Sequence, residues 1–150
     1  MPALYVIGRI LFAALFLVSG INKFLDLQSA AQAISTHFTV PVQLAEYASQ
    51  IETFTGIPIA QVIAVLGGIL EILGALAIAT NLGARAFAVL LALHLMLTVF
   101  YFNDFWNAAA TERTASLFEA LKNLALIGAL LMIASRPREI AVSGTSYTDF

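Results

Sequence analysis

The chain has 150 residues, of which 61% are hydrophobic and only 11% are charged. Soluble domains carry about 25% charged residues, so this composition excludes an ordinary soluble domain and indicates a single membrane domain. The seven Lys and Arg residues are scattered and the net charge is -2, which argues against a nucleic-acid partner. The absence of cysteine excludes disulfides and thiolate metal sites, and we expect no metal site.

Four apolar segments are long enough to cross a bilayer, whose hydrocarbon core takes about 20 helical residues. The sequence therefore predicts an all-α, four-transmembrane-helix bundle. Pro58 suits a helix start, and Asn81 followed by Gly83 suits a helix end. The first segment resembles a cleaved signal in part, since Ala31-Gln32-Ala33 looks like a cleavage site, but we interpret it as a retained span. The spans are expected at about residues 4–25, 59–80, 84–102 and 117–134.

Residues 26–58 form a long, partly helical outer loop between the first two spans, and this loop contains no Lys or Arg. Two short helices are expected within it, at about residues 28–37 and 42–54, separated by Pro41. Their apolar positions suit either the membrane interface or a cap over the bundle, and we prefer the cap. The polar tail, residues 136–150, is expected to be loosely ordered.

Four spans place both termini on the same side of the membrane, and basic residues favour the cytoplasmic side. The basic residues divide four to three, with none in the long outer loop, so we expect both termini in the cytoplasm. The four are Arg9, Arg85, Arg136 and Arg138, and the three on the other side are Lys23, Arg113 and Lys122.

One carboxylate, Glu71, lies near the centre of the second span. Residues three, four and seven apart share one face of a helix, so Glu71 lies among small residues that let another helix approach. We therefore expect Glu71 to face protein rather than lipid. The other residues of this face are Ala64, Gly67, Gly68, Gly74, Ala75 and Ile78.

Arg9 of the first span is the expected partner of Glu71. Counted from the cytoplasmic ends of their helices, the two residues differ in depth by only about 4 to 5 Å. An unpaired charge in lipid is unfavourable, so we predict a buried Arg9–Glu71 ion pair. This pair either only fixes which helices pack together or belongs to a proton or quinol site at Glu71. Extension of Arg9 to the lipid headgroups is the remaining alternative.

A second polar cluster is expected at the outer ends of three spans. His94 begins a stripe of hydrogen-bonding side chains, because residues at i, i+4 and i+7 lie on one helix face. The groups converge beneath aromatic residues and suit proton relay or the binding of a polar headgroup. Interhelical hydrogen bonding and solvated helix ends are the alternatives. The candidate polar pocket comprises Lys23, His94, Thr98, Tyr101, Asp104, Glu119, Lys122 and Asn123.

Recognisable catalytic motifs are absent: the sequence has no phosphate-binding glycine loop, serine nucleophile elbow or His-Glu-x-x-His pattern. Catalytic residues are therefore unknown, and we expect no catalysis by this chain alone.

Several short segments taken together suggest a family. They are Gly8-Arg9-Ile10-Leu11 with Ser19-Gly20-Ile21-Asn22-Lys23-Phe24, the segment from Gly68 to Gly74 with Glu71, Gly83-Ala84-Arg85, and Lys122-Asn123-Leu124-Ala125-Leu126-Ile127-Gly128. In their order and spacing, over about residues 5–135, they resemble the DoxX family of small four-helix bacterial membrane proteins.

The resemblance implies a multi-pass protein of the bacterial cytoplasmic membrane. It also implies an integral subunit of a membrane-associated oxidoreductase or respiratory-type complex, acting as a docking platform that lines a quinone or proton site. Quinone is the only cofactor it implies, and the expected partners are the lipid bilayer, other membrane or peripheral subunits, or further copies of the chain. Two alternatives remain open: a small homo-oligomeric transporter or lipid-handling protein, and a structural accessory subunit of a larger membrane assembly.

Overall fold

The structure is a computed structural model that describes residues 2–103 and 105–135. Within these residues every regular element is a helix, and four of the helices are long and apolar enough to cross a membrane by length and composition. The predicted all-α class with four candidate spans is confirmed at this level. The elements are α1 (Pro2–Leu25), α2 (Leu27–His37), the 3-10 helix η1 (Val42–Leu44), α3 (Ala45–Thr55), α4 (Ile59–Thr80), α5 (Ala84–Phe102) and α6 (Arg113–Ala134).

Helices α4 and α5 begin and end at the residues expected from the sequence, because local signals mark their boundaries. Pro58 precedes α4 with an extended backbone, while Asn81 and Gly83 adopt left-handed conformations in the turn that joins α4 to α5. Helix α6 begins earlier than expected, at Arg113 rather than near residue 117, because the residues between contain no Gly or Pro to stop it. The tail at 136–150 lies outside the described residues.

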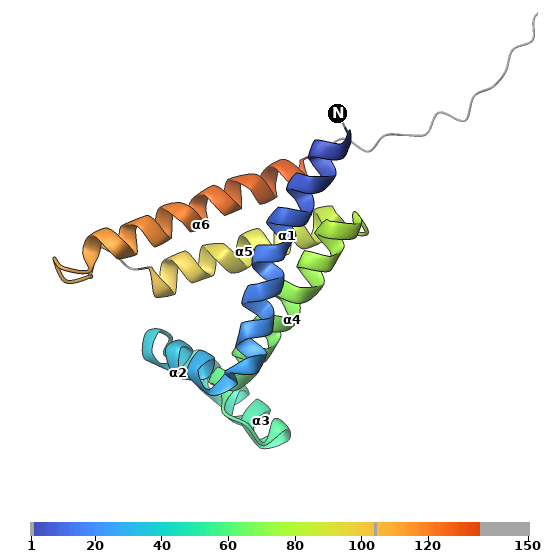
Figure 1. Ribbon diagram of the computed structural model, residues 1–150. Coiled ribbons are helices and arrows are strands. Elements are labelled where there is room, and N and C mark those ends of the chain that lie inside the picture. Colours follow the sequence, from blue (N-terminus) through green and yellow to red (C-terminus); the bar gives the residue numbers. More distant parts are fainter. Residues whose placement is uncertain (1, 104, 136–150) are drawn as a thin grey trace, which may run out of the picture.

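The spanning helices form two pairs that diverge from one end (Figure 1). Helix α1 packs along α4, α6 packs along α5, and α4 contacts α5. The pairs meet near the turn between α4 and α5 and separate toward the opposite end, where α2 and α3 lie. The beginning of α1 and the end of α6 lie at the same end. The four helices thus form an open wedge rather than a closed bundle.

The buried core lies where the two pairs meet, and it includes Phe16, Ile78, Leu91 and Leu130, one from each spanning helix. Away from this core, large apolar side chains point outward; Met132, for example, is 72% exposed. Water would make so much exposed apolar surface unfavourable, whereas lipid does not, so these faces are those expected of a multi-pass membrane protein.

Glycines allow the close approach of both neighbours of α4. A Cβ atom added at Gly20 of α1 would lie 2.7 Å from Ile72 Cγ1 and 2.9 Å from the carbonyl oxygen of Gly68. On another flank of α4, a Cβ atom at Gly74 would lie 2.6 Å from Leu91 Cδ1 of α5. The α1–α4 contact at Gly20 and Gly68 therefore fixes how far along α4 each residue of α1 lies.

Helix α2 lies at the end where the two helix pairs separate (Figure 1), packs on α4, and reaches the end of α5 with its last residues. Its last ring, His37, lies 5.3 Å from the ring of Phe102, and the following Phe38 lies 5.2 Å from the ring of Tyr101. Asp26 begins α2 by accepting a hydrogen bond from the Ser29 backbone N–H. Hydrogen bonds from the Ser29 side chain and backbone hold the pKa of Asp26 below its ordinary value.

Helix α3 differs from the cap interpretation, because its apolar side chains remain exposed. Phe54 near its end is 92% exposed. The helix is nonetheless tied to the start of α4, since Glu52 Oε1 accepts a hydrogen bond of 2.7 Å from the Ile59 backbone N–H. A helix held this close to a spanning segment, with an uncovered apolar face, suits the membrane interface.

Replacing Gly20 by Ala should lower the thermal stability of the protein in detergent. The added Cβ atom would meet a backbone carbonyl that cannot move aside, and overpacking of this kind costs typically about 1–3 kcal/mol. Gly128→Ala is the matched control, because a Cβ atom there meets nothing within 4 Å and alanine favours a helix. Equal melting temperatures for the two variants would show that α1 and α4 are not in close contact at Gly20.

Candidate functional site

A buried carboxylate lies where α1, α4 and α5 come together. Glu71 is only 4% exposed, and the small-residue face expected from the sequence is the buried face of α4. The prediction that Glu71 faces protein is therefore confirmed.

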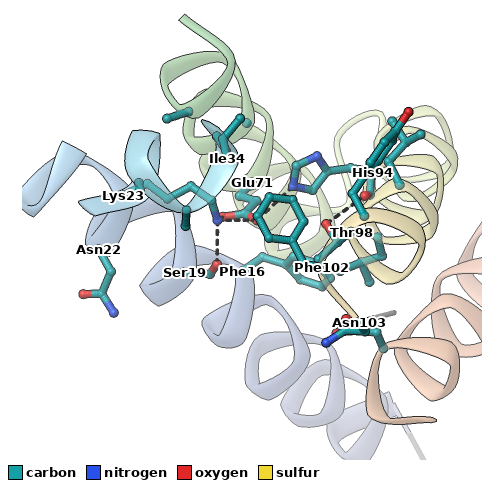
Figure 2. A pocket seen from close by; sticks show the side chains of 18 of the residues that line it. Phe16, Ser19, Asn22, Lys23, Ile34, Glu71, His94, Thr98, Phe102 and Asn103 are labelled. Atoms are coloured by element: carbon teal, nitrogen blue, oxygen red, sulfur yellow. Dashed lines mark hydrogen bonds and ion pairs between the residues drawn. The ribbon is translucent and has the colours of Figure 1, made fainter. Parts of the chain in front are cut away.

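Lys23 of α1 and His94 of α5 are the partners of this carboxylate (Figure 2). Lys23 Nζ donates to Glu71 Oε2 at 2.7 Å and to Oε1 at 2.9 Å, and its third hydrogen bond goes to Ser19 Oγ at 3.1 Å. His94 Nε2 lies 3.2 Å from Glu71 Oε1. We call Lys23, Glu71 and His94 the charged triad; its ammonium and carboxylate groups neutralise each other.

The predicted ion pair between Arg9 and Glu71 is wrong, because Glu71 pairs with Lys23 instead. Arg9 Nη2 instead donates to the carbonyl oxygen of Ala79 at 2.8 Å, and the guanidinium lies 5.3 Å from the centre of the Tyr5 ring. Ala79 is eight residues beyond Glu71, which is about 12 Å along a helix. The predicted depths were wrong because they assumed that α1 begins at the level where α4 ends. In the structure it is Arg9, seven residues after the start of α1 at Pro2, that lies beside Ala79 near the end of α4.

A pocket of about 950 Å³ lies between the two helix pairs, with the charged triad on its wall. The α2 side is lined by apolar residues such as Ala33 and Ile34, and the α1 side by Phe16. Most of the lining is apolar. Its volume is within the usual range for pockets that hold small organic molecules, and such pockets typically combine apolar walls with a few polar groups.

Every described member of the candidate polar pocket lies on the wall of this one pocket, and Asp104 lies outside the described residues. The members are Lys23, His94, Thr98, Tyr101, Glu119, Lys122 and Asn123. Their arrangement differs from the expected outer cluster, because Lys23 turns toward Glu71. The expected stripe is also interrupted: Thr98 Oγ1 donates to the backbone carbonyl of His94, 3.0 Å away, and so does not extend a relay from the imidazole ring.

The remaining polar residues form a more exposed rim, which we define as Asn103, Glu119, Lys122 and Asn123. Lys122 Nζ donates to Glu119 Oε2 at 2.5 Å, but both side chains are 55% exposed, so this pair contributes little to stability. Asn123 Nδ2 donates to Asn103 Oδ1 at 3.0 Å and so joins α6 to the end of α5. The rim is thus more exposed than the Glu71 carboxylate, which is buried.

The sequence interpretation missed some of the pocket residues. Ser19 precedes Lys23 by one helical turn, so the i, i+4 spacing was a usable signal for their hydrogen bond. Asn103 and Phe38 carry no comparable signal. Asn103 is held by Asn123 of α6, and Phe38 contacts Tyr101 of α5, and neither long-range contact is encoded by local spacing.

Together, the fold and the site define a multi-pass helical membrane protein with a charged triad in a pocket between its helices. No group of three His, Cys, Asp or Glu residues in the described part of the chain is placed to hold a metal ion. The chain matches the family described as HR-like lesion-inducing over residues 1–135, and it belongs to that family. Comparisons with curated proteins and with solved structures give no match.

This membership corrects the resemblance to the DoxX family, which is wrong. The segments that suggested it are rich in small and apolar residues. Such patterns recur in membrane helices because small residues let helices pack closely, whatever the family.

A double-mutant cycle should distinguish the two possible partners of Glu71. Lys23→Met and Glu71→Gln should show a coupling free energy within about 0.5–3 kcal/mol, because each variant removes the other's contact. Each single variant should be destabilised, since each leaves one charge of the pair without its counter-ion. The measurement is unfolding in detergent. Arg9→Gln combined with Glu71→Gln should be additive within about 0.5 kcal/mol, and a larger coupling there would restore the pairing with Arg9.

Proposed function

We propose that this chain is an integral membrane subunit that binds a lipid-soluble molecule of the quinone class between its helix pairs, within a membrane-associated oxidoreductase assembly. The observation that carries the proposal is the charged triad on the wall of an otherwise mainly apolar pocket of about 950 Å³. A quinone has the matching chemistry: an apolar ring and tail, with oxygens that hydrogen-bond.

His94 is the residue of the triad best suited to meet such a headgroup. The hydrogen bonds of Lys23 are directed to Glu71 and Ser19, whereas His94 uses Nε2 toward Glu71 and its Nδ1 makes no hydrogen bond within the described residues. A neutral imidazole that donates through Nε2 can accept at Nδ1 from a quinol hydroxyl. A protonated imidazole can donate there to a quinone carbonyl. Both forms of the ligand therefore have a partner.

A quinone held in this pocket would supply the electron-transfer chemistry, with partner subunits as the other redox partners. The residues of this chain hold its headgroup and exchange protons with it. Glu71 contributes by stabilising the imidazolium, and Lys23 offsets the carboxylate charge when the imidazole is neutral.

Glu71→Gln should lower the quinone content of the purified protein by roughly tenfold or more, since the loss of about 1.4 kcal/mol of binding free energy is a factor of ten. The measurement is mild-detergent purification from native membranes, followed by solvent extraction and mass spectrometry. Glu46→Gln is the matched control, because Glu46 is an exposed acid of α3 that does not line the pocket. Wild-type protein without quinone, or equal quinone in both variants, would contradict the proposal.

Lipid handling by a small homo-oligomeric transporter is the second candidate, favoured by the apolar walls, which suit an acyl chain as well as a quinone tail. The same extraction distinguishes the two, because a lipid-handling protein would yield no quinone. The charged triad favours the quinone, since an acyl chain gains nothing from it. A structural accessory subunit would retain no ligand in the pocket that carries the charged triad.

We also propose that both termini lie on the cytoplasmic side of the membrane. The support is the long segment of residues 26–58, which carries α2 and α3 without any Lys or Arg. In this orientation the end of the pocket that is lined by α2 lies toward the outer side of the membrane.

Single cysteines should test this orientation cleanly, because the natural sequence has none. Ser49→Cys on α3 should react with a membrane-impermeant maleimide in intact cells. Leu82→Cys, in the turn between α4 and α5, should react only after permeabilisation. The reversed labelling pattern would place the termini on the outer side.

A further inference from the structure

A second, smaller pocket lies between α1 and α6, away from the charged triad. Its volume is about 340 Å³, and its wall includes Tyr5, Gly8 and Arg9 of α1 with Ala129 and Met132 of α6. It lies at the end of the wedge where α1 begins and α6 ends (Figure 1). Apart from Arg9 its lining is mainly apolar, so it combines one positive charge with a surface suited to hydrocarbon.

The hydrogen-bonding capacity of Arg9 is largely unused. Its Nη2 donates to the Ala79 carbonyl, while its Nε is buried and makes no hydrogen bond within the described residues. A buried donor without a partner is unfavourable, and more so when the group is charged. The Tyr5 ring lies against the guanidinium and holds it in place, 5.3 Å from the ring centre. Within the described residues the fixed cation therefore has no counter-ion.

The level of Arg9 in the membrane identifies where a counter-ion would come from. Arg9 is bonded to Ala79, and α4 ends one residue later at Thr80. The guanidinium therefore lies near the edge of the hydrocarbon layer, close to the lipid headgroups, rather than near its centre. A lipid with an acidic headgroup can reach this level and lay its chain on the apolar surface.

We propose that the pocket between α1 and α6 is a specific binding site for an anionic phospholipid. The phosphate accepts hydrogen bonds from Arg9, whose planar fork suits phosphate oxygens, and an acyl chain packs along Phe12 and Met132. This site shares no residue with the proposed quinone pocket, so either proposal can fail without the other.

The test is native mass spectrometry of the protein released from mixed micelles of phosphatidylglycerol and phosphatidylcholine. Wild-type protein should retain phosphatidylglycerol in preference to phosphatidylcholine, and Arg9→Gln should lose that preference by about tenfold. Arg9→Lys should retain part of it, because the charge remains while the fork is lost. Arg85→Gln is the control: it removes one positive charge near the same end of the wedge, from a residue that does not line this pocket. Equal retention by Arg9→Gln and Arg85→Gln would overturn the site.

Gly8→Leu provides a second variant that keeps Arg9 intact. A Cβ atom at Gly8 meets no atom within 4 Å, so a leucine there should partly fill the pocket without disturbing α1. The Gly8→Leu variant should lose the lipid preference while keeping the wild-type melting temperature. If Arg9→Gln fails to fold, a Gly8→Leu variant that keeps the wild-type lipid preference would overturn the site. Stabilisation of the wild-type protein by inorganic phosphate as strong as that by phosphatidylglycerol would overturn the lipid assignment and indicate a site for a free anion.

Discussion

Burial of the Glu71 carboxylate within an apolar helix is the constraint on which the rest of the structure depends. An unpaired carboxylate in that setting is unfavourable by several kcal/mol, so cations and hydrogen-bond donors must be brought to it. Helix α1 brings Lys23 and helix α5 brings His94. Both helices must approach α4 closely, which requires the glycines near Glu71. The small-residue face and the charged triad are thus two parts of the same solution.

The same constraint accounts for the wedge. Lys23 and His94 reach Glu71 from α1 and α5, so both helices are committed to α4, while α6 packs along α5. The two pairs separate toward the end near α2, and the space between them is the pocket. The rings of His37 and Phe38 contact Phe102 and Tyr101 across that end. The charged triad therefore lies on the wall of a cavity and not within the closely packed core.

Features that depend on local sequence signals could be predicted, whereas the relative positions of distant helices could not. The bounds of α4 and the buried face that carries Glu71 could be predicted, because each depends on spacing within one helix or on a turn residue. The partner of Glu71 could not. It depends on the contact between Gly20 and Gly68, which joins distant segments and has no local signature. That contact sets the position of α1 along α4, so that Lys23 lies beside Glu71 and Arg9 lies beside Ala79. Family assignment from short helical segments failed because different membrane families share the same packing patterns.

The identity of Lys23 narrows what the pocket accepts. Its ammonium group makes three hydrogen bonds, two to Glu71 and one to Ser19, so the charge pair is satisfied within the protein. An arginine there would carry five donors in a rigid fork and leave some unpaired. With Lys23 and Glu71 balanced, the triad offers polarity without excess charge when His94 is neutral. A charged headgroup would then enter the apolar pocket without a counter-ion, whereas a neutral headgroup needs only a hydrogen bond from or to His94. Charge balance therefore favours a neutral, lipid-soluble ligand in this pocket, and an acidic lipid at Arg9, whose positive charge has no carboxylate partner among the described residues.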